Sequence, residues 1–186
     1  PLPREVRVLL LGLSMIILCR AGMKAALTIY LPTFLTARGQ SLWMAGLALS
    51  LLQFSGTAGV FAAGIVSDRL GRRRSLLIMN VGAPLLMLIF LVTPAFMQLP
   101  LFAVMGLFVF GTGPVILSEV HQLKRPDMAY INGLYMTLNF VLNSLMILLV
   151  GLGADTIGYI STWWIAMIIA FVAVPMTFIL KEDQRG

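Results

Sequence analysis

The chain has 186 residues, of which 60% are apolar and 11% are charged. A soluble domain carries about 25% charged residues, and a soluble fold this short could not bury so much apolar surface, so the composition excludes a water-soluble enzyme. Thirteen Lys and Arg against seven Asp and Glu give a net charge of +6. Because the basic residues separate apolar runs and form no continuous face, they favour a membrane topology over nucleic-acid binding.

Six apolar stretches follow one another along the chain, and each is long enough to cross a bilayer, which takes about 20 residues. They cover Val6–Leu35, Leu42–Val66, Ser75–Met97, Leu101–Ser118, Ala129–Leu152 and Tyr159–Leu180. Lipid offers no partner to backbone N–H and C=O groups, so these stretches must be helices. We therefore predict an all-α integral membrane protein, with one six-helix transmembrane bundle over residues 1–186 and an over-long first helix. Because the chain begins at Pro1 without a methionine, we interpret it as a fragment or a processed product.

The distribution of Lys and Arg predicts the orientation. If the stretches cross the membrane in turn, one side holds ten basic residues and the other side holds one, with Arg20 and Lys24 inside the first stretch. The ten are Arg4, Arg7, Arg69, Arg72, Arg73, Arg74, Lys124, Arg125, Lys181 and Arg185, and the one is Arg38. Since basic residues stay inside, both termini are expected in the cytoplasm, in an inner or plasma membrane.

One pattern occurs twice. G-x-x-x-D-x-x-G begins at Gly64 and again 87 residues later at Gly151, near the ends of the second and fifth stretches. The same offset relates Gly46-Leu47 to Gly133-Leu134. Coincidence among common residues is the alternative. We favour two three-helix repeats, at about residues 6–97 and 99–181, with the second inverted in the membrane because three crossings separate the copies.

The first copy of this pattern continues into a basic cluster, Gly64-Ile65-Val66-Ser67-Asp68-Arg69-Leu70-Gly71-Arg72-Arg73-Arg74. Glycines let helices approach closely, Asp68 can cap the next helix or pair with an arginine, and the arginines suit the inner surface potential. A plain positive-inside loop is the alternative, but it needs no fixed Gly and Asp spacing. The segment resembles the cytoplasmic signature loop of the major facilitator superfamily, between the second and third helices of each six-helix half. The resemblance implies that Gly64, Asp68, Arg69, Gly71, Arg72 and Arg73 form a gating loop.

The chain is more similar to a C-terminal than to an N-terminal half of that family. Its fourth stretch lacks the arginine, and its fifth the Gly-Pro motif, that many N-terminal halves carry. The strings Tyr30–Leu35, Asn132–Met136 and Gly151–Gly158 resemble fosmidomycin-resistance-like and related drug or metabolite exporters, some of them antiporters. The resemblance implies alternating access against a partner bundle, either the missing six-helix half or a second copy, with a proton gradient as the usual energy source.

Arg20 and Lys24 are the most informative polar residues, because they share one face near the middle of the first stretch. Each charge at mid-membrane costs about 2.5–3.5 kcal/mol on insertion scales, and no Asp or Glu lies within a stretch to neutralise it. The alternative is that they snorkel to an interface. We favour a central cavity that holds an anionic substrate or a carboxylate from the absent half.

The fifth stretch carries a polar stripe, Asn132, Tyr135, Asn139 and Asn143, at helical spacing. Helix–helix hydrogen bonding and cavity lining are the two interpretations, and we take Tyr135, Asn139 and Asn143 as candidate substrate-binding residues with Arg20 and Lys24. At the end of the fourth stretch, Glu119 and the only histidine, His121, are weak candidates for proton coupling. A solvated helix end is the plainer interpretation of that pair.

No spacing of catalytic or metal-ligating residues appears in the sequence, so we expect no enzyme, no cofactor and no metal. The predicted function is a secondary active transporter half that moves a small solute by alternating access. An anionic substrate, drug efflux and proton coupling are its open details. The alternative is a non-transporting accessory or scaffold subunit of a membrane complex, and the expected partners are the lipid bilayer, a small-molecule substrate and another bundle, with no nucleic acid.

Overall fold

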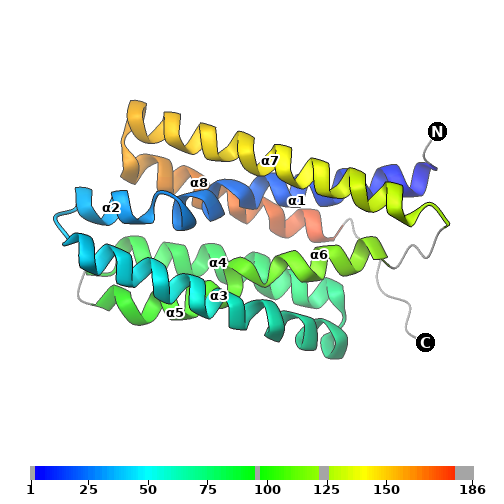
Figure 1. Ribbon diagram of the computed structural model, residues 1–186, viewed down its shortest axis with the longest axis horizontal. Helices are drawn as coiled ribbons and strands as arrows, with labels where there is room; N and C mark the ends of the chain where they lie inside the picture. The colour runs from blue at the N-terminus through cyan, green and yellow to red at the C-terminus, as the bar shows by residue number, and fades with distance from the viewer. Residues whose placement is uncertain (1–2, 95–96, 122–125, 179–186) are drawn as a thin grey trace.

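A computed structural model of the chain describes residues 3–94, 97–121 and 126–178, and these are helical almost throughout. The helices lie side by side along one axis (Figure 1). In chain order they are α1 (Arg4–Thr28), α2 (Leu31–Ala37), α3 (Leu42–Leu70), α4 (Arg72–Val92), α5 (Gln98–Phe110), α6 (Thr112–His121), α7 (Met128–Ile157) and α8 (Tyr159–Thr177). Within the described ranges, six segments are long and apolar enough to cross a membrane, with α5 and α6 together forming the fourth.

Two of the predicted stretches are interrupted by proline. The expectation of one over-long first helix over Val6–Leu35 was wrong, because α1 ends at Thr28 and α2 begins at Leu31. A continuous helix would drive the ring of Pro32 into the carbonyl of Thr28, four residues earlier. Pro114 stands in the same relation to Phe110, the last residue of α5, and there the fourth stretch divides into α5 and α6.

The basic loop predicted over Arg69–Arg74 is much shorter in the structure, where Gly71 alone separates α3 from α4. Gly71 has φ 84° and ψ 153°, a conformation that is almost restricted to glycine. Gly158, 87 residues later, separates α7 from α8 with φ 84° and ψ 158°. The hydroxyl four residues after each glycine, on Ser75 and on Thr162, donates to that glycine's carbonyl at 2.9 Å. This shared geometry supports the predicted repeat.

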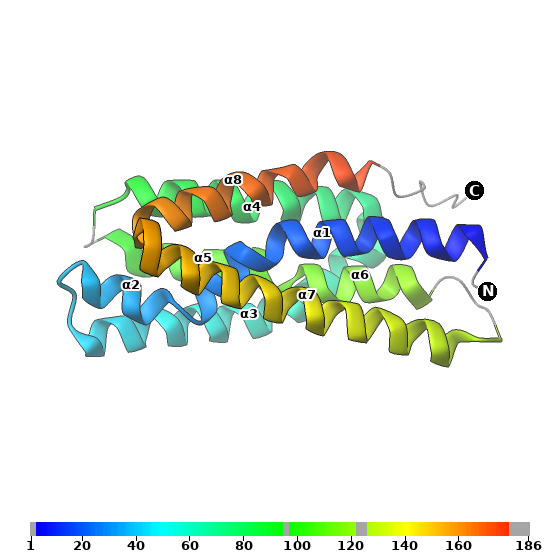
Figure 2. The ribbon, with the colours of Figure 1, turned by 90° about the horizontal axis from the view of Figure 1, so that it is seen from above.

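The packing of the helices follows the same two-fold relation. α1 packs against α7 and α8, while α5 packs against α3 and α4, and α4 also packs against α8. Exchanging the first three spans with the last three converts the α1–α7 pairing into α3–α5, converts α1–α8 into α4–α5, and leaves α4–α8 unchanged. Figure 2 shows the bundle from above, with α1 lying between α7 and α8. Since each half supplies the neighbours of the other, the six spans form one body.

The two ends of the bundle differ in charge. One end of the bundle holds the start of α1 and the C-terminal ends of α3, α6 and α8 (Figure 1). The opposite end holds α2 and the α7–α8 turn. The first end carries Arg4, Arg7, Arg69 and Arg72–Arg74, and the second carries Arg38. Lys124, Arg125, Lys181 and Arg185 lie outside the described residues. In the described part of the chain, successive spans therefore run in opposite directions, as the prediction of orientation assumed.

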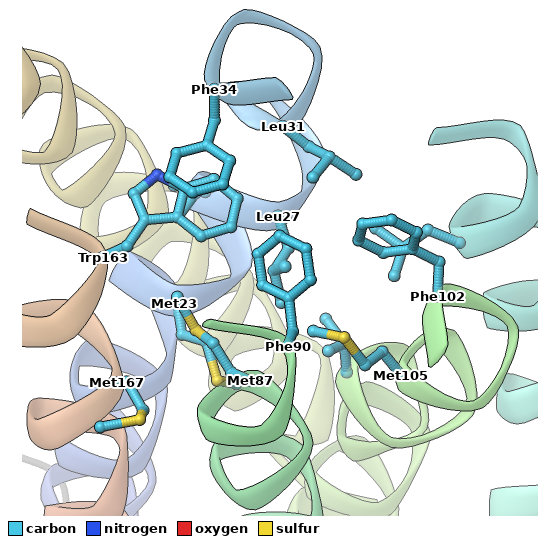
Figure 3. Packing of buried hydrophobic residues seen from close by; sticks show 14 of the residues in the cluster. Met23, Leu27, Leu31, Phe34, Met87, Phe90, Phe102, Met105, Trp163 and Met167 are labelled. Atoms are coloured by element: carbon cyan, nitrogen blue, oxygen red, sulfur yellow. The ribbon is translucent and has the colours of Figure 1, made fainter. Parts of the chain in front are cut away.

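Aromatic side chains fill the core toward the end that carries α2 (Figure 3). The ring of Phe34 stacks on Trp163 with centroids 4.1 Å apart, and Phe90 lies tilted against both rings. Phe102 of α5 completes the cluster at 5.1 Å from Phe90. These four side chains are fully buried, so the short helix α2 is held to α4, α5 and α8 by an apolar core.

Candidate functional site

The five residues that the sequence selected as substrate-binding candidates line one cleft between α1, the α5–α6 junction and α7. Arg20 and Lys24 enter it from α1, and Tyr135, Asn139 and Asn143 enter it from α7. This small cleft has a volume of about 100 Å³. A large cleft of about 290 Å³ adjoins it between α1 and α7 and shares Lys24, Asn139 and Asn143 with it.

Arg20 lies inside the bundle with only 6% of its surface exposed. Its Nη1 donates to the carbonyl of Met79 at 2.9 Å and to Oδ1 of Asn80 at 2.7 Å. Its Nη2 donates to the carbonyl of Phe108 at 3.1 Å. Snorkelling would have placed the guanidinium at a membrane interface, and the structure instead holds it among oxygen acceptors of α4 and α5.

Asn80 is the functional neighbour that sequence reasoning missed. It is fully buried, and its Nδ2 donates to Oγ1 of Thr177 at 3.2 Å and to the carbonyl of Ala173 at 3.5 Å. Arg20, Asn80 and Thr177 therefore form a hydrogen-bonded chain from α1 through α4 to α8. The available signal was a single amide in the apolar run of α4, but nothing in the sequence pairs it with a residue 60 positions away.

Lys24 differs from Arg20 in its surroundings. Its side chain is exposed at the place where the two clefts meet, and its Nζ lies 5.7 Å from the ring centroid of Phe110. A cation over an aromatic face is attracted by the ring quadrupole, although the ring supplies no oxygen acceptor. Lys24 is thus the cation that faces the open part of the site.

Three residues of the α7 polar stripe, Tyr135, Asn139 and Asn143, line this site, whereas Asn132 lines neither cleft. Nδ2 of Asn143 donates to the carbonyl and to Oδ1 of Asn139, both at 2.7 Å, so the described hydrogen bonds of this pair stay within α7. Tyr135 is buried, with 4% exposure. Thr112 also lines the small cleft, and its buried hydroxyl has no hydrogen-bond partner among the described residues.

The other predicted site residues lie elsewhere. Gly64, Asp68 and Arg69 belong to the last two turns of α3, Gly71 is the turn, and Arg72 and Arg73 begin α4. The guanidinium of Arg73 lies 5.2 Å from the ring centroid of Phe178, next to the end of α8.

Glu119 and His121, the candidates for proton coupling, lie in the last turn of α6. Neither residue lines the small or the large cleft. His121 is exposed and Glu119 is half-buried. The structure therefore does not bring this pair together with the five cleft residues.

The fold is that of a multi-pass membrane protein whose spans enclose a cationic cleft, which is the architecture of a solute transporter. The family model of the Major Facilitator Superfamily matches residues 13–185. The chain belongs to the major facilitator superfamily, in which it represents one six-helix half, and it is a membrane transporter of small molecules and not a member of an enzyme family. A comparison with curated proteins found no match, and the particular likeness to fosmidomycin-resistance-like exporters is not confirmed.

Proposed function

We propose that this bundle moves a small solute by alternating access, with the two clefts between α1 and α7 as one wall of the solute's path. The observation that carries the proposal is the convergence of five polar residues from two helices in one place. Polar and charged groups inside a membrane are costly, and they persist where they face a water-filled cavity or a ligand. Secondary transporters bind their solutes near the midplane, where Arg20 and Lys24 are expected.

A second bundle completes the path. α3 and α7 are the least buried spans, and each carries small or polar residues on its exposed face, three of them at positions 87 residues apart in the two helices. On α3 these residues are Gly46, Ser50, Gln53 and Thr57, and on α7 they are Gly133, Thr137 and Ser144. Such a face suits protein or water better than lipid, because small residues let helices approach and hydroxyls bond across helices. The occupant is the missing six-helix half or a second copy of this chain.

The charged end of the bundle is the cytoplasmic end, with both termini in the cytoplasm of an inner or plasma membrane. There the segment from Gly64 to Arg73 acts as the gating loop, because the turn at Gly71 couples the ends of α3 and α4. Energy comes from a proton gradient, with Glu119 and His121 as the coupling pair, because histidine changes its charge near neutral pH. The direction is export of a drug or a metabolite, because Tyr30–Leu35, Asn132–Met136 and Gly151–Gly158 resemble segments of exporters.

The test is solute flux into proteoliposomes that hold this bundle together with the second bundle, are supplied with a small-molecule extract of the source cells, and are analysed by mass spectrometry. We expect at least one solute to enter saturably, and we expect Lys24→Met to abolish its flux. Ile168→Leu is the matched control, because Ile168 is exposed on α8 and lies in neither cleft. If every solute enters at the rate of protein-free liposomes, the chain is an accessory or scaffold subunit instead.

A further inference from the structure

The walls of the two clefts carry positive charge that no wall residue neutralises. Arg20 and Lys24 contribute two cations, and the residues lining both clefts include no Asp or Glu. In the described part of the chain the acidic residues lie in or next to the first or last turns of helices: Glu5, Asp68, Glu119, Asp127 and Asp155. Such a site attracts an anion, because the buried charge of Arg20 is screened less than a charge in bulk water.

The two cations have different tasks. The hydrogen bonds of Arg20 to Met79, Asn80 and Phe108 hold its guanidinium in place, so it provides a fixed positive field. Lys24 has no oxygen partner for its Nζ among the described residues, and only the ring of Phe110 lies over it. The ammonium of Lys24 is therefore the group that is available to contact an anionic ligand directly.

The small cleft suits a compact group. Its volume of about 100 Å³ is well below the range of about 300–1,000 Å³ that drug-sized ligands need. The hydroxyl of Thr112 lines this cleft, is more than nine-tenths buried and has no partner among the described residues. A buried hydroxyl without a partner is unfavourable, and an acceptor oxygen of a ligand would satisfy it.

The large cleft has room for more of an organic ligand. Its volume of about 290 Å³ is close to the lower limit for such ligands. Its wall is mixed, because Ala25, Phe140 and Ile147 stand beside Thr28 and Ser144. It joins the small cleft at Lys24, Asn139 and Asn143, which line both. A ligand that fills both clefts has a compact end and a larger end, with the change between them at Lys24.

We propose that the transported solute is an organic anion, with its anionic head at Lys24 and Thr112 in the small cleft and its larger body in the large cleft. This inference rests on the proposed function and specifies its substrate class. It assigns a ligand contact to Thr112. Arg20 contributes a fixed positive charge near the ligand without contacting it. Lys24 makes the contact that distinguishes an anion from a neutral molecule of the same shape.

The experiment measures equilibrium binding of tritiated 2-naphthoate to the purified protein, with octanoate, 2-naphthamide and acetate as competitors. We expect saturable binding of 2-naphthoate and competition by octanoate. The amide lacks the charge and acetate lacks the larger body, so each should compete at least tenfold more weakly. Lys24→Met should weaken binding by about tenfold to a hundredfold, Lys24→Arg should retain it, and Thr112→Val should weaken it severalfold.

Arg38→Gln is the matched control, because it removes one positive charge at the α2 end of the bundle, away from both clefts, and should leave binding unchanged. Equal competition by 2-naphthamide overturns the anionic head, and equal competition by acetate overturns the larger body. Absence of any 2-naphthoate binding also overturns the proposal. A carboxylate from a second bundle on Lys24 would produce that result, and it would make Lys24→Met lower the stability of the assembly.

A parallel measurement separates failure of this proposal from failure of the proposed function. In a Cys19→Ala background, Asn143→Cys should react with a membrane-impermeant thiol reagent, and 2-naphthoate should slow the reaction. Reaction without protection leaves the water-filled path intact and overturns only the organic anion. No reaction at all contradicts the path itself and the ligand with it.

Discussion

Replacing Asn80 with leucine should destabilise the bundle by about 1.5–3 kcal/mol, the range for a hydrogen bond to a charged group. Asn80 is fully buried, and its Oδ1 accepts the shortest of the Arg20 hydrogen bonds, at 2.7 Å. Leucine would leave Nη1 with the carbonyl of Met79 alone. Neutral hydrogen bonds between membrane helices average only about 0.6 kcal/mol, so the size of the effect reports whether the charge matters.

A double-mutant cycle tests the reasoning more strictly. Arg20→Met removes the buried charge, and in its presence Asn80→Leu should cost much less, because no unpaired cation remains. Thr177→Val is the control, since it removes an acceptor from Asn80 Nδ2 but none from Arg20. The assay is the free energy of unfolding in mixed micelles of rising SDS content, followed by tryptophan fluorescence. A cost below about 0.5 kcal/mol for Asn80→Leu, or strict additivity of the two substitutions, would refute the account.

Three further predictions concern glycines and the gating loop. Gly106→Ala should destabilise the bundle by about 1–3 kcal/mol, because its Cβ would overlap the backbone of α3, whereas Gly133→Ala, with open space around it, should raise the free energy of unfolding by up to about 1 kcal/mol, because alanine is the better helix former. Gly71→Ala and Gly158→Ala should each lower the free energy of unfolding by about 1–3 kcal/mol, and by similar amounts, since both glycines have φ 84°. A large difference between the two losses would contradict the shared geometry. Asp68→Asn should abolish flux and leave solute affinity unchanged, so a parallel loss of affinity, measured by equilibrium binding, would place Asp68 in the binding site instead.

Hydropathy and helical spacing were sufficient to predict the six spans and the meeting of Lys24 with the α7 stripe. The spans follow from the length of apolar runs, and the stripe follows from Tyr135, Asn139 and Asn143 recurring every three or four residues. These features are local in the sequence. A membrane also restricts the possible structures to helices here, so few alternatives had to be considered.

The features that the sequence analysis missed depend on steric detail or on distant contacts. The break after Thr28 was overlooked because the apolar run continues through Pro32, although the proline itself was a usable signal. The binding of Arg20 by Asn80 joins residues 60 positions apart, and no periodicity within one helix encodes such a pair. Thr112 lies in a Gly- and Pro-containing segment whose relation to α7 exists only in the folded bundle.

The most direct test of the central claim is thiol labelling of Asn139→Cys from each side of the membrane, in a Cys19→Ala background with Ile168→Cys as the lipid-facing control. Right-side-out and inside-out vesicles expose opposite faces of the protein to a membrane-impermeant reagent. Alternating access predicts that Asn139→Cys reacts in both vesicle types and that Ile168→Cys reacts in neither, because Asn139 lines both clefts and Ile168 lines neither. Reaction of Asn139→Cys from one side only, or from neither, would contradict a solute path along α1 and α7.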